Sequence, residues 1–324
     1  MLNKLVAVGT ASAMLFCVSV AQAQQKWDMP TGYPGSNFHT ENIRQFAADV
    51  DQASAGKLKI TVHDGGSLFK ANEIKRAVQT GQTQIGEFIL SGAANENALF
   101  GIDSIPFLAT TYAQARKLND ISNPALEKLL AGQGLKLLYA VPWPGQSLYS
   151  SKPIKSLADL KGTKMRAYNP ATTRIAELVG AQPVTIQLAE LPQALATGGV
   201  DNFLTSSASG VESKLYEQVK YFYDVNAWLP RNAVVVNLKA FDTLDAATKA
   251  ALTKVGEAAG ERGWKTSDQK DDEFLKELAA KGMTVDRSSE TLKRELQAIG
   301  TRMAADWARQ AGPEGQAILD AYRK

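Results

Sequence analysis

Hydrophobic and polar positions repeat with two different periods in the first part of the chain. Residues 43–50 place apolar side chains at helical spacing, and Gly56 follows at a position suited to a helix end. Residues 57–62 alternate lysine or threonine with leucine, isoleucine and valine. That second pattern predicts a half-buried strand directly after the helix.

The same two patterns continue in alternation up to about residue 240. Leu135 to Val141 is a nearly continuous apolar run, which predicts a strand buried on both faces. Further strands are predicted over residues 85–90, 163–168 and 233–238 and at residue 200, and helices over residues 72–80, 171–179 and 188–197. Strands and helices in alternation predict an α/β architecture with mainly parallel sheets.

Helical periodicity takes over after about Leu244, and Met283 to Val285 is the one later strand signal. A stripe formed by Leu292, Leu296, Ile299 and Met303 predicts a helix face packed in the core. A helical tail of this length requires a large surface to lie on, and two α/β lobes would provide one. The proline-rich residues 141–145 and the segment 223–231 are predicted to cross between the lobes.

The first 23 residues have the pattern of a secretory signal peptide. Lys4 gives a basic start, Leu5 to Val20 is uncharged and apolar, and Ala21-Gln22-Ala23 supplies small residues for cleavage after Ala23. The alternative is a single membrane anchor, but the apolar run is shorter than about 18 residues and lacks a stop-transfer flank. We therefore expect export to the periplasm. Cleavage also removes Cys17, the only cysteine, so the exported chain has no thiol.

Composition and charge narrow the range of functions. The chain has 324 residues, 44% of them hydrophobic, and its 36 Lys and Arg against 33 Asp and Glu leave a net charge of +3, too small to indicate a nucleic-acid partner. It contains no P-loop, no G-x-G-x-x-G after a strand, no H-E-x-x-H and no G-x-S-x-G. No cofactor or metal is expected. A distant catalytic carboxylate pair stays open, so a secreted hydrolase or lyase is the alternative class.

Several segments, taken in order, resemble the solute-binding proteins of tripartite ATP-independent periplasmic (TRAP) transporters, the DctP-type family. They are Ser54 to Ile60 with Glu73, Val78 and Gly81; Lys152 to Ile154 with Asp159 to Arg166; and Gly180 to Val184 with Ala194, Leu195 and Gly198 to Asp201. The resemblance implies no enzyme but a two-lobed periplasmic-binding-protein-like fold with a hinge and long C-terminal helices. It further implies that a small organic acid is bound between the lobes and delivered to membrane permease subunits. We expect residues 24–144 plus 232–265 to form lobe I, and residues 145–231 plus 266–324 to form lobe II.

Arg166 is the leading candidate for the ligand's carboxylate. It lies at the end of a predicted strand, where ligands bind in α/β folds, and its guanidinium matches a carboxylate in a bidentate pair. The resemblance places the family's carboxylate-binding arginine here. Some relatives carry a second arginine where this chain has Gln146 and Ser147, which favours a monocarboxylate. Thr205 stands near the place of a family asparagine and keeps a hydroxyl for the ligand.

The remaining candidates are aromatic or polar residues near the predicted strand ends and crossings. They are Tyr168, Asn169, Trp143, Phe88, Asn37, Phe38, Trp228 and Glu73. Each aromatic ring could equally belong to the core, and Glu73 could equally cap its helix or remain in solvent. Aromatic walls around one guanidinium favour a small monocarboxylate with an aromatic or apolar group. A sugar acid or a C4-dicarboxylate is the alternative ligand.

Overall fold

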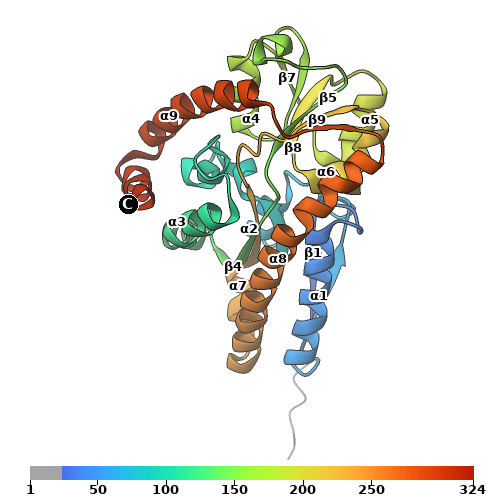
Figure 1. Cartoon of the computed structure of the whole chain (residues 1–324). Coiled ribbons are helices and arrows are strands. Elements are labelled where there is room, and N and C mark those ends of the chain that lie inside the picture. The colour runs from blue at the N-terminus through green and yellow to red at the C-terminus, as the bar shows by residue number, and fades with distance from the viewer. Residues whose placement is uncertain (1–23) are drawn as a thin grey trace, which may run out of the picture.

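The computed structural model describes residues 24–324 (Figure 1). The predicted signal peptide, which contains Cys17 and ends at Ala23, lies outside the described residues. The described part begins at Gln24, directly after the predicted cleavage site. No helix in the described part is long and apolar enough to cross a membrane.

The chain folds into two lobes, with the strands of each lobe drawn from separate parts of the sequence (Figure 1). Lobe I holds a parallel pair, β1 (Gln25–Pro30) with β2 (Leu58–His63), and a sheet in the order β3 (Ile85–Ile89), β10 (Arg231–Asn237), β4 (Leu135–Pro142). Lobe II holds one sheet in the order β11 (Thr284–Asp286), β9 (Tyr221–Tyr223), β5 (Ser147–Ser150), β8 (Asn202–Thr205), β6 (Lys164–Ala167), β7 (Gln182–Thr185). The two-lobed α/β fold is therefore confirmed.

Helices cover the sheets and connect the strands. The α-helices are α1 (Phe38–Ala53), α2 (Ile74–Gln79), α3 (Tyr112–Gly132), α4 (Pro170–Leu178), α5 (Leu191–Ala196), α6 (Ser207–Glu212), α7 (Leu238–Asp242), α8 (Ala246–Ala280) and α9 (Glu290–Arg323). Short 3₁₀ turns lie at Leu90–Ala93, Ala98–Ser104, Leu157–Leu160, Leu188–Glu190 and Leu215–Glu217.

The sheets are mixed, so the prediction of mainly parallel sheets is wrong. Strand β10 runs antiparallel to both β3 and β4, and β5 runs antiparallel to both β8 and β9. The physical reason is the route of the chain. A strand that returns from the other lobe enters its sheet from the opposite end to strands joined by a helical crossover within one lobe.

The two predicted crossings lie where the chain changes sheets, between β4 and β5 and between β9 and β10. They touch each other. A Cβ built on Gly145 in the first crossing would lie 1.4 Å from Oδ1 of Asn226 in the second. Asn226 itself has a left-handed backbone (φ 46°), and its Nδ2 donates to the carbonyl of Thr110 at 2.9 Å. The absence of a side chain at position 145 therefore lets the two crossings pack directly.

The C-terminal helices span the molecule (Figure 1). Helix α8 packs against α1 and β4 in lobe I and against α6 in lobe II. The predicted stripe on α9 is buried against the lobe II core, whereas Trp307 and Leu319, further along α9, pack against Ile102 and Leu118. The residue boundaries of the lobes stay a prediction, and α9 contributes to the packing of both lobes.

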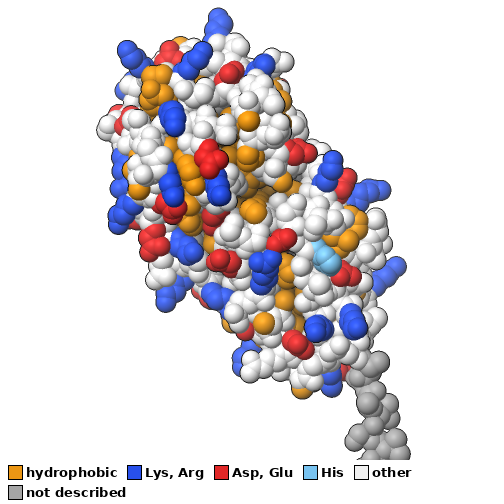
Figure 2. Space-filling model, turned by 90° about the vertical axis from the view of Figure 1, so that its right-hand side faces the viewer, with side chains coloured by type: hydrophobic (Ala, Val, Ile, Leu, Met, Phe, Trp, Pro, Cys, Tyr) orange, Lys and Arg blue, Asp and Glu red, His pale blue; other side chains and the backbone are white. Residues whose placement is uncertain are grey.

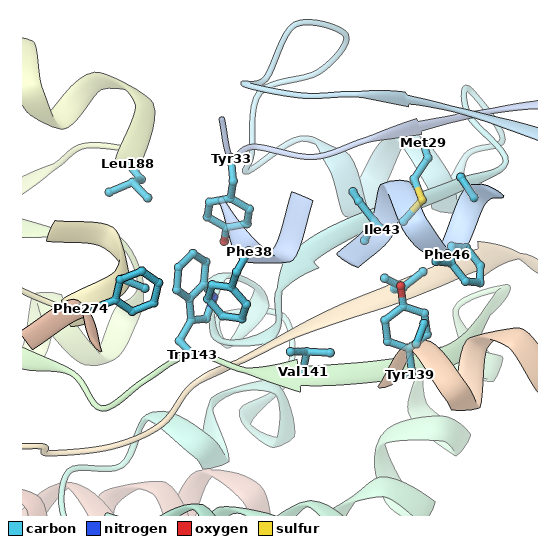
Figure 3. Packing of buried hydrophobic residues seen from close by; sticks show 14 of the residues in the cluster. Met29, Tyr33, Phe38, Ile43, Phe46, Tyr139, Val141, Trp143, Leu188 and Phe274 are labelled. Atoms are coloured by element: carbon cyan, nitrogen blue, oxygen red, sulfur yellow. The ribbon is translucent and has the colours of Figure 1, made fainter. Parts of the chain in front are cut away.

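The main hydrophobic cluster contains many aromatic rings. Figure 3 shows the rings of Tyr33, Phe38 and Trp143 gathered together in the main hydrophobic cluster, with Phe274 on one side of them and Phe46 and Tyr139 on the other. On the face shown in Figure 2, Lys and Arg side chains are interspersed with Asp and Glu on both lobes. That face therefore presents no extended field of one sign.

Candidate functional site

A cavity of about 220 Å³ lies between the lobes and is lined by residues of both. Its walls include Tyr33 and Phe88 from lobe I, Trp143 from the first crossing, and Arg166 and Thr205 from lobe II. This volume is below the range of about 300–1,000 Å³ that is typical of sites for drug-sized molecules. The cavity therefore suits a small molecule.

Strand β6 explains how Arg166 reaches the cavity. Alternation along the strand buries Met165 in the core of lobe II and turns Arg166 to the opposite face. Strands β6 and β8 run parallel, so Arg166 and Thr205 lie toward the same edge of the sheet. Tyr168 follows β6 directly and also lines the cavity.

Arg166 is a buried cation with no carboxylate partner. Its side chain is 4% exposed, its Nε donates to the carbonyl of Ile186 at 2.9 Å, and its guanidinium carbon lies 5.0 Å from the centre of the Tyr168 ring. Within residues 24–324 no Asp or Glu forms an ion pair with it, and no hydrogen bond from its two terminal nitrogens is found. Burial lowers the pKa of Arg166 to about 10, so it remains protonated at neutral pH.

Aromatic side chains form part of the cavity wall. The indole Nε1 of Trp143 and the hydroxyl of Tyr33 both donate to Oδ1 of Asn232, at 2.9 Å and 3.2 Å. This shared acceptor holds the two rings in place, with centroids 4.9 Å apart. Tyr168 donates from its hydroxyl to Gln146 at 3.2 Å, which fixes the third ring.

Five of the ten predicted site residues line the cavity: Arg166, Tyr168, Thr205, Trp143 and Phe88. The other five do not, and each has a different place in the fold. These five are Asn169, Asn37, Phe38, Trp228 and Glu73.

The two asparagines begin helices. Asn37 is the N-cap of α1, where its side chain accepts from His39 N and donates to Glu212. Asn169 is the N-cap of α4, where Oδ1 accepts from Thr172 N at 2.8 Å, and its Nδ2 donates to Ser91 in lobe I at 2.9 Å. Their amides are thus occupied by helix ends and by contacts between the lobes.

Of the other three candidates, two are packed in hydrophobic cores and one is exposed to solvent. Phe38 lies behind Trp143, with ring centroids 5.4 Å apart, and Trp228 is fully enclosed in the core of lobe II. Glu73 is exposed, and its carboxylate accepts a hydrogen bond from the backbone N–H of Lys70 at 3.2 Å. This is one of the alternatives that the sequence left open.

Four charged residues that line the cavity, Lys75, Arg76, Glu87 and Glu96, were not among the predicted site residues. Lys75 is buried but already bonded to Glu96 at 2.5 Å, and Arg76 is exposed to solvent. Glu87 is buried in the middle of β3. A single carboxylate inside the apolar run 85–90 was the signal that could have found it.

The described residues contain no cluster of three or more His, Cys, Asp or Glu side chains placed to hold a metal ion. A buried, protonated and unpaired arginine beside aromatic walls can bind a carboxylate and shelter the rest of a small molecule from water.

Comparisons with known proteins agree with this geometry. Residues 32–311 match the model of the family described as bacterial extracellular solute-binding protein, family 7. The crystal structure of DctP6, a Bordetella pertussis extracytoplasmic solute receptor binding pyroglutamic acid, is 54% identical, covers 92% of this chain and 99% of its own, and superposes with a TM-score of 0.91.

Two further relatives extend the comparison. A TRAP solute-binding protein from a marine metagenome, described as specific for pyroglutamate, is 44% identical over 93% of this chain and 99% of its own, with a TM-score of 0.91. A solute-binding protein of Albidiferax ferrireducens is 27% identical, covering 88% of this chain and 87% of its own. The chain therefore belongs to family 7 of the bacterial extracellular solute-binding proteins and is a solute-binding protein of the TRAP type.

Proposed function

We propose that this protein is a periplasmic receptor for pyroglutamate, a five-membered lactam with one carboxylate. It would capture this solute between its lobes and deliver it to the permease subunits of a TRAP transporter. Export would follow from the signal-peptide pattern of residues 1–23.

The single observation that carries the proposal is the state of Arg166. Placing a charge in a buried site costs several kcal/mol unless that charge is paired, and in this protein the pairing group is missing from the described residues. A ligand carboxylate would complete the pair with two parallel hydrogen bonds to the free guanidinium nitrogens. A neutral ligand would leave the cost in place.

The other lining residues would select the remainder of the ligand. Trp143, Phe88 and Tyr168 offer ring faces and edges, and Thr205 offers a hydroxyl. Together with the small volume, these groups suit a compact ring better than a densely hydroxylated sugar acid, which requires many polar partners. Further support comes from two relatives, 54% and 44% identical, that bind pyroglutamate.

The test is a binding panel on secreted protein that has been unfolded and refolded to remove any solute already bound. The panel contains pyroglutamate, an aryl 2-oxo acid, a C4-dicarboxylate and a hexuronate. Pyroglutamate is expected to raise the Tm most, because stabilisation follows RT ln(1 + [L]/Kd), or about 2.7 kcal/mol at a hundredfold excess over Kd. Tighter binding of any other member by titration calorimetry would overturn the choice of ligand.

The same samples separate a receptor from a secreted hydrolase or lyase. After long incubation with catalytic amounts of protein, mass spectrometry should recover pyroglutamate unchanged. Ring opening to glutamate, or any other turnover of the panel compounds, would count against a receptor.

A further inference from the structure

Glu87 is a carboxylate in the cavity wall without a cationic partner among the described residues. Its side chain is 2% exposed, and it lies on β3 in lobe I, whereas Arg166 reaches the cavity from lobe II. The cavity wall therefore contains one buried cation, Arg166, and one buried anion, Glu87, neither of which forms an ion pair with Lys, Arg, Asp or Glu among residues 24–324.

The groups around Glu87 leave part of its hydrogen-bonding capacity unused. Thr31 donates from its hydroxyl to Oε2 at 2.7 Å, and Nδ1 of His39 lies 3.4 Å from Oε1. Burial lowers the pKa of His39, so this histidine is neutral at pH 7 and does not neutralise the carboxylate. A carboxylate has about four acceptor positions, and these two neighbours occupy two of them.

The other carboxylate in the cavity wall, Glu96, has a cationic partner within the chain. Glu96 accepts from Nζ of Lys75 at 2.5 Å, so its charge is paired within the chain. Glu87 has no Lys or Arg within ion-pair distance in residues 24–324. The Glu87 carboxylate can therefore accept a further hydrogen bond, and a molecule bound in the cavity would supply the donor.

We propose that Glu87 is a specificity-determining residue that accepts a hydrogen bond from an N–H group of the ligand while Arg166 holds the ligand's carboxylate. This inference rests on the proposed function, since the lactam of pyroglutamate has its N–H on the carbon that bears the carboxylate. Closure would then bring an anion-binding group from one lobe and a donor-binding group from the other onto two groups attached to the same carbon of the ligand.

The proposal predicts weak binding of compounds that have the shape of pyroglutamate but lack its N–H group. In the lactone of the same shape, 5-oxotetrahydrofuran-2-carboxylate, a ring oxygen replaces the N–H and would turn its lone pairs toward the Glu87 carboxylate. A buried acceptor left without its donor is costly, and sites built around such a hydrogen bond reject the analogue that lacks it. We expect the lactone to bind at least about a hundredfold more weakly than pyroglutamate.

The experiment compares both compounds by titration calorimetry on the wild-type protein and on Glu87→Gln. A glutamine amide can donate to the lactone oxygen, so the ratio of the two dissociation constants should fall below about ten in the variant. Glu96→Gln is the matched control: it makes the same substitution in the same cavity at a carboxylate that is already paired, and it should leave the wild-type ratio unchanged. Circular dichroism and Tm verify that each variant is folded.

The possible results distinguish a wrong role for Glu87 from a wrong proposed function. If the wild-type protein binds pyroglutamate and the lactone equally well, the role of Glu87 is wrong and the proposed function stands. If the ratio of the two dissociation constants is the same in the wild type and in Glu87→Gln, another residue causes the discrimination and the role of Glu87 is again wrong. If the wild-type protein does not bind pyroglutamate, the proposed function fails and this inference fails with it.

Discussion

Two buried arginines of this chain have opposite surroundings. Arg231 donates from Nε to Asp103 at 3.0 Å and from Nη1 to Asn119 at 2.6 Å, so its charge is paired within the fold. Arg166 has a backbone carbonyl and a ring face beside it, and no carboxylate among the described residues. The first arginine has its partners within lobe I, and the second is the one that we propose binds the ligand.

Replacing Arg166 tests that difference. Arg166→Ala should weaken binding of the native acid by about 3–5 kcal/mol, or two to three decades or more in Kd, because a closed cavity would hold an unpaired carboxylate. Arg166→Lys should also bind poorly, since an ammonium cannot reproduce the planar pair of donors. Titration calorimetry measures both variants.

The control for Arg166 is Lys164→Ala, on the same strand but with its side chain exposed and its Nζ donating to the carbonyl of Gly198. It should bind like the wild type. Near-native affinity of Arg166→Ala would remove this residue from the carboxylate site.

At the scale of the element, the contact between the two crossings is the tightest constraint. Gly145→Ala should lower the free energy of unfolding by about 1–3 kcal/mol, because its Cβ would overlap the side chain of Asn226. That side chain cannot move freely, since Nδ2 is bonded to the carbonyl of Thr110. Urea unfolding at constant m-value measures the loss.

Two further variants make this prediction specific. Gly132→Ala, at the end of α3 with no atom within 4 Å of the new Cβ, should be neutral or stabilising by about 0.5–1 kcal/mol. Adding Asn226→Gly to Gly145→Ala should recover most of the loss, because glycine removes the overlapping atoms and accepts the left-handed backbone. An unchanged Cm for Gly145→Ala alone would show that the crossings can separate without cost.

Some helices and strands could be predicted from the sequence, and others could not. The buried strands β4 and β10 and the core stripe of α9 were predicted because long apolar patterns depend little on what lies around them. Strand β5 has only four residues, and β9 has three, so their pairing is decided by distant neighbours that a local pattern does not contain. Strand direction was missed for the same reason.

The residues of the candidate site also differ in how far the sequence indicated them. Arg166 was identified through a family motif, and the physics of its strand end agreed with the motif. Asn37 and Asn169 lie outside the cavity lining, because each asparagine caps the start of a helix with its side chain, a role that its position before a helix also indicates. Glu87 was overlooked because the pattern around it is entirely that of a core strand.

At the scale of the whole molecule, Glu212 joins the lobes. It ends α6 in lobe II, and its carboxylate accepts from the backbone N–H of Phe38 at 3.1 Å and from the side chain of Asn37 at the start of α1 in lobe I. Burial raises the pKa of Glu212 to about 8, although the hydrogen bonds from Phe38 and Asn37 and the charge of Lys270 on α8 act against this rise; Glu41 on α1 adds to it. Opening the hinge would return this carboxylate to water and to its ordinary pKa of 4.5.

Closure is therefore expected to take up a proton between about pH 4.5 and pH 8. Since the pKa is raised in the closed form, the contribution of Glu212 to closure is fully present at the lower end of this window and is lost as the pH rises through about 8. Ligand affinity should fall between pH 6 and pH 8.5 in the wild type and stay flatter in Glu212→Gln. Scattering at each pH should show a smaller radius of gyration with ligand than without.

The matched control is Glu217→Gln, an exposed glutamate in the same lobe. It should keep the wild-type pH dependence. An identical slope in wild type and Glu212→Gln would assign the pH dependence to another group, and a radius of gyration that does not change on binding would argue against hinge closure.

The position of β10 in its sheet also affects how the protein is made. This strand, at residues 231–237, lies between β3 and β4, which end at residues 89 and 142. The middle of that sheet is therefore missing until about 95 more residues have been synthesised after β4, roughly 5–20 s at ribosomal rates. The proposed export through a translocation channel in an unfolded state would benefit from this delay, because the lobe that is begun first cannot be completed before most of the polypeptide exists.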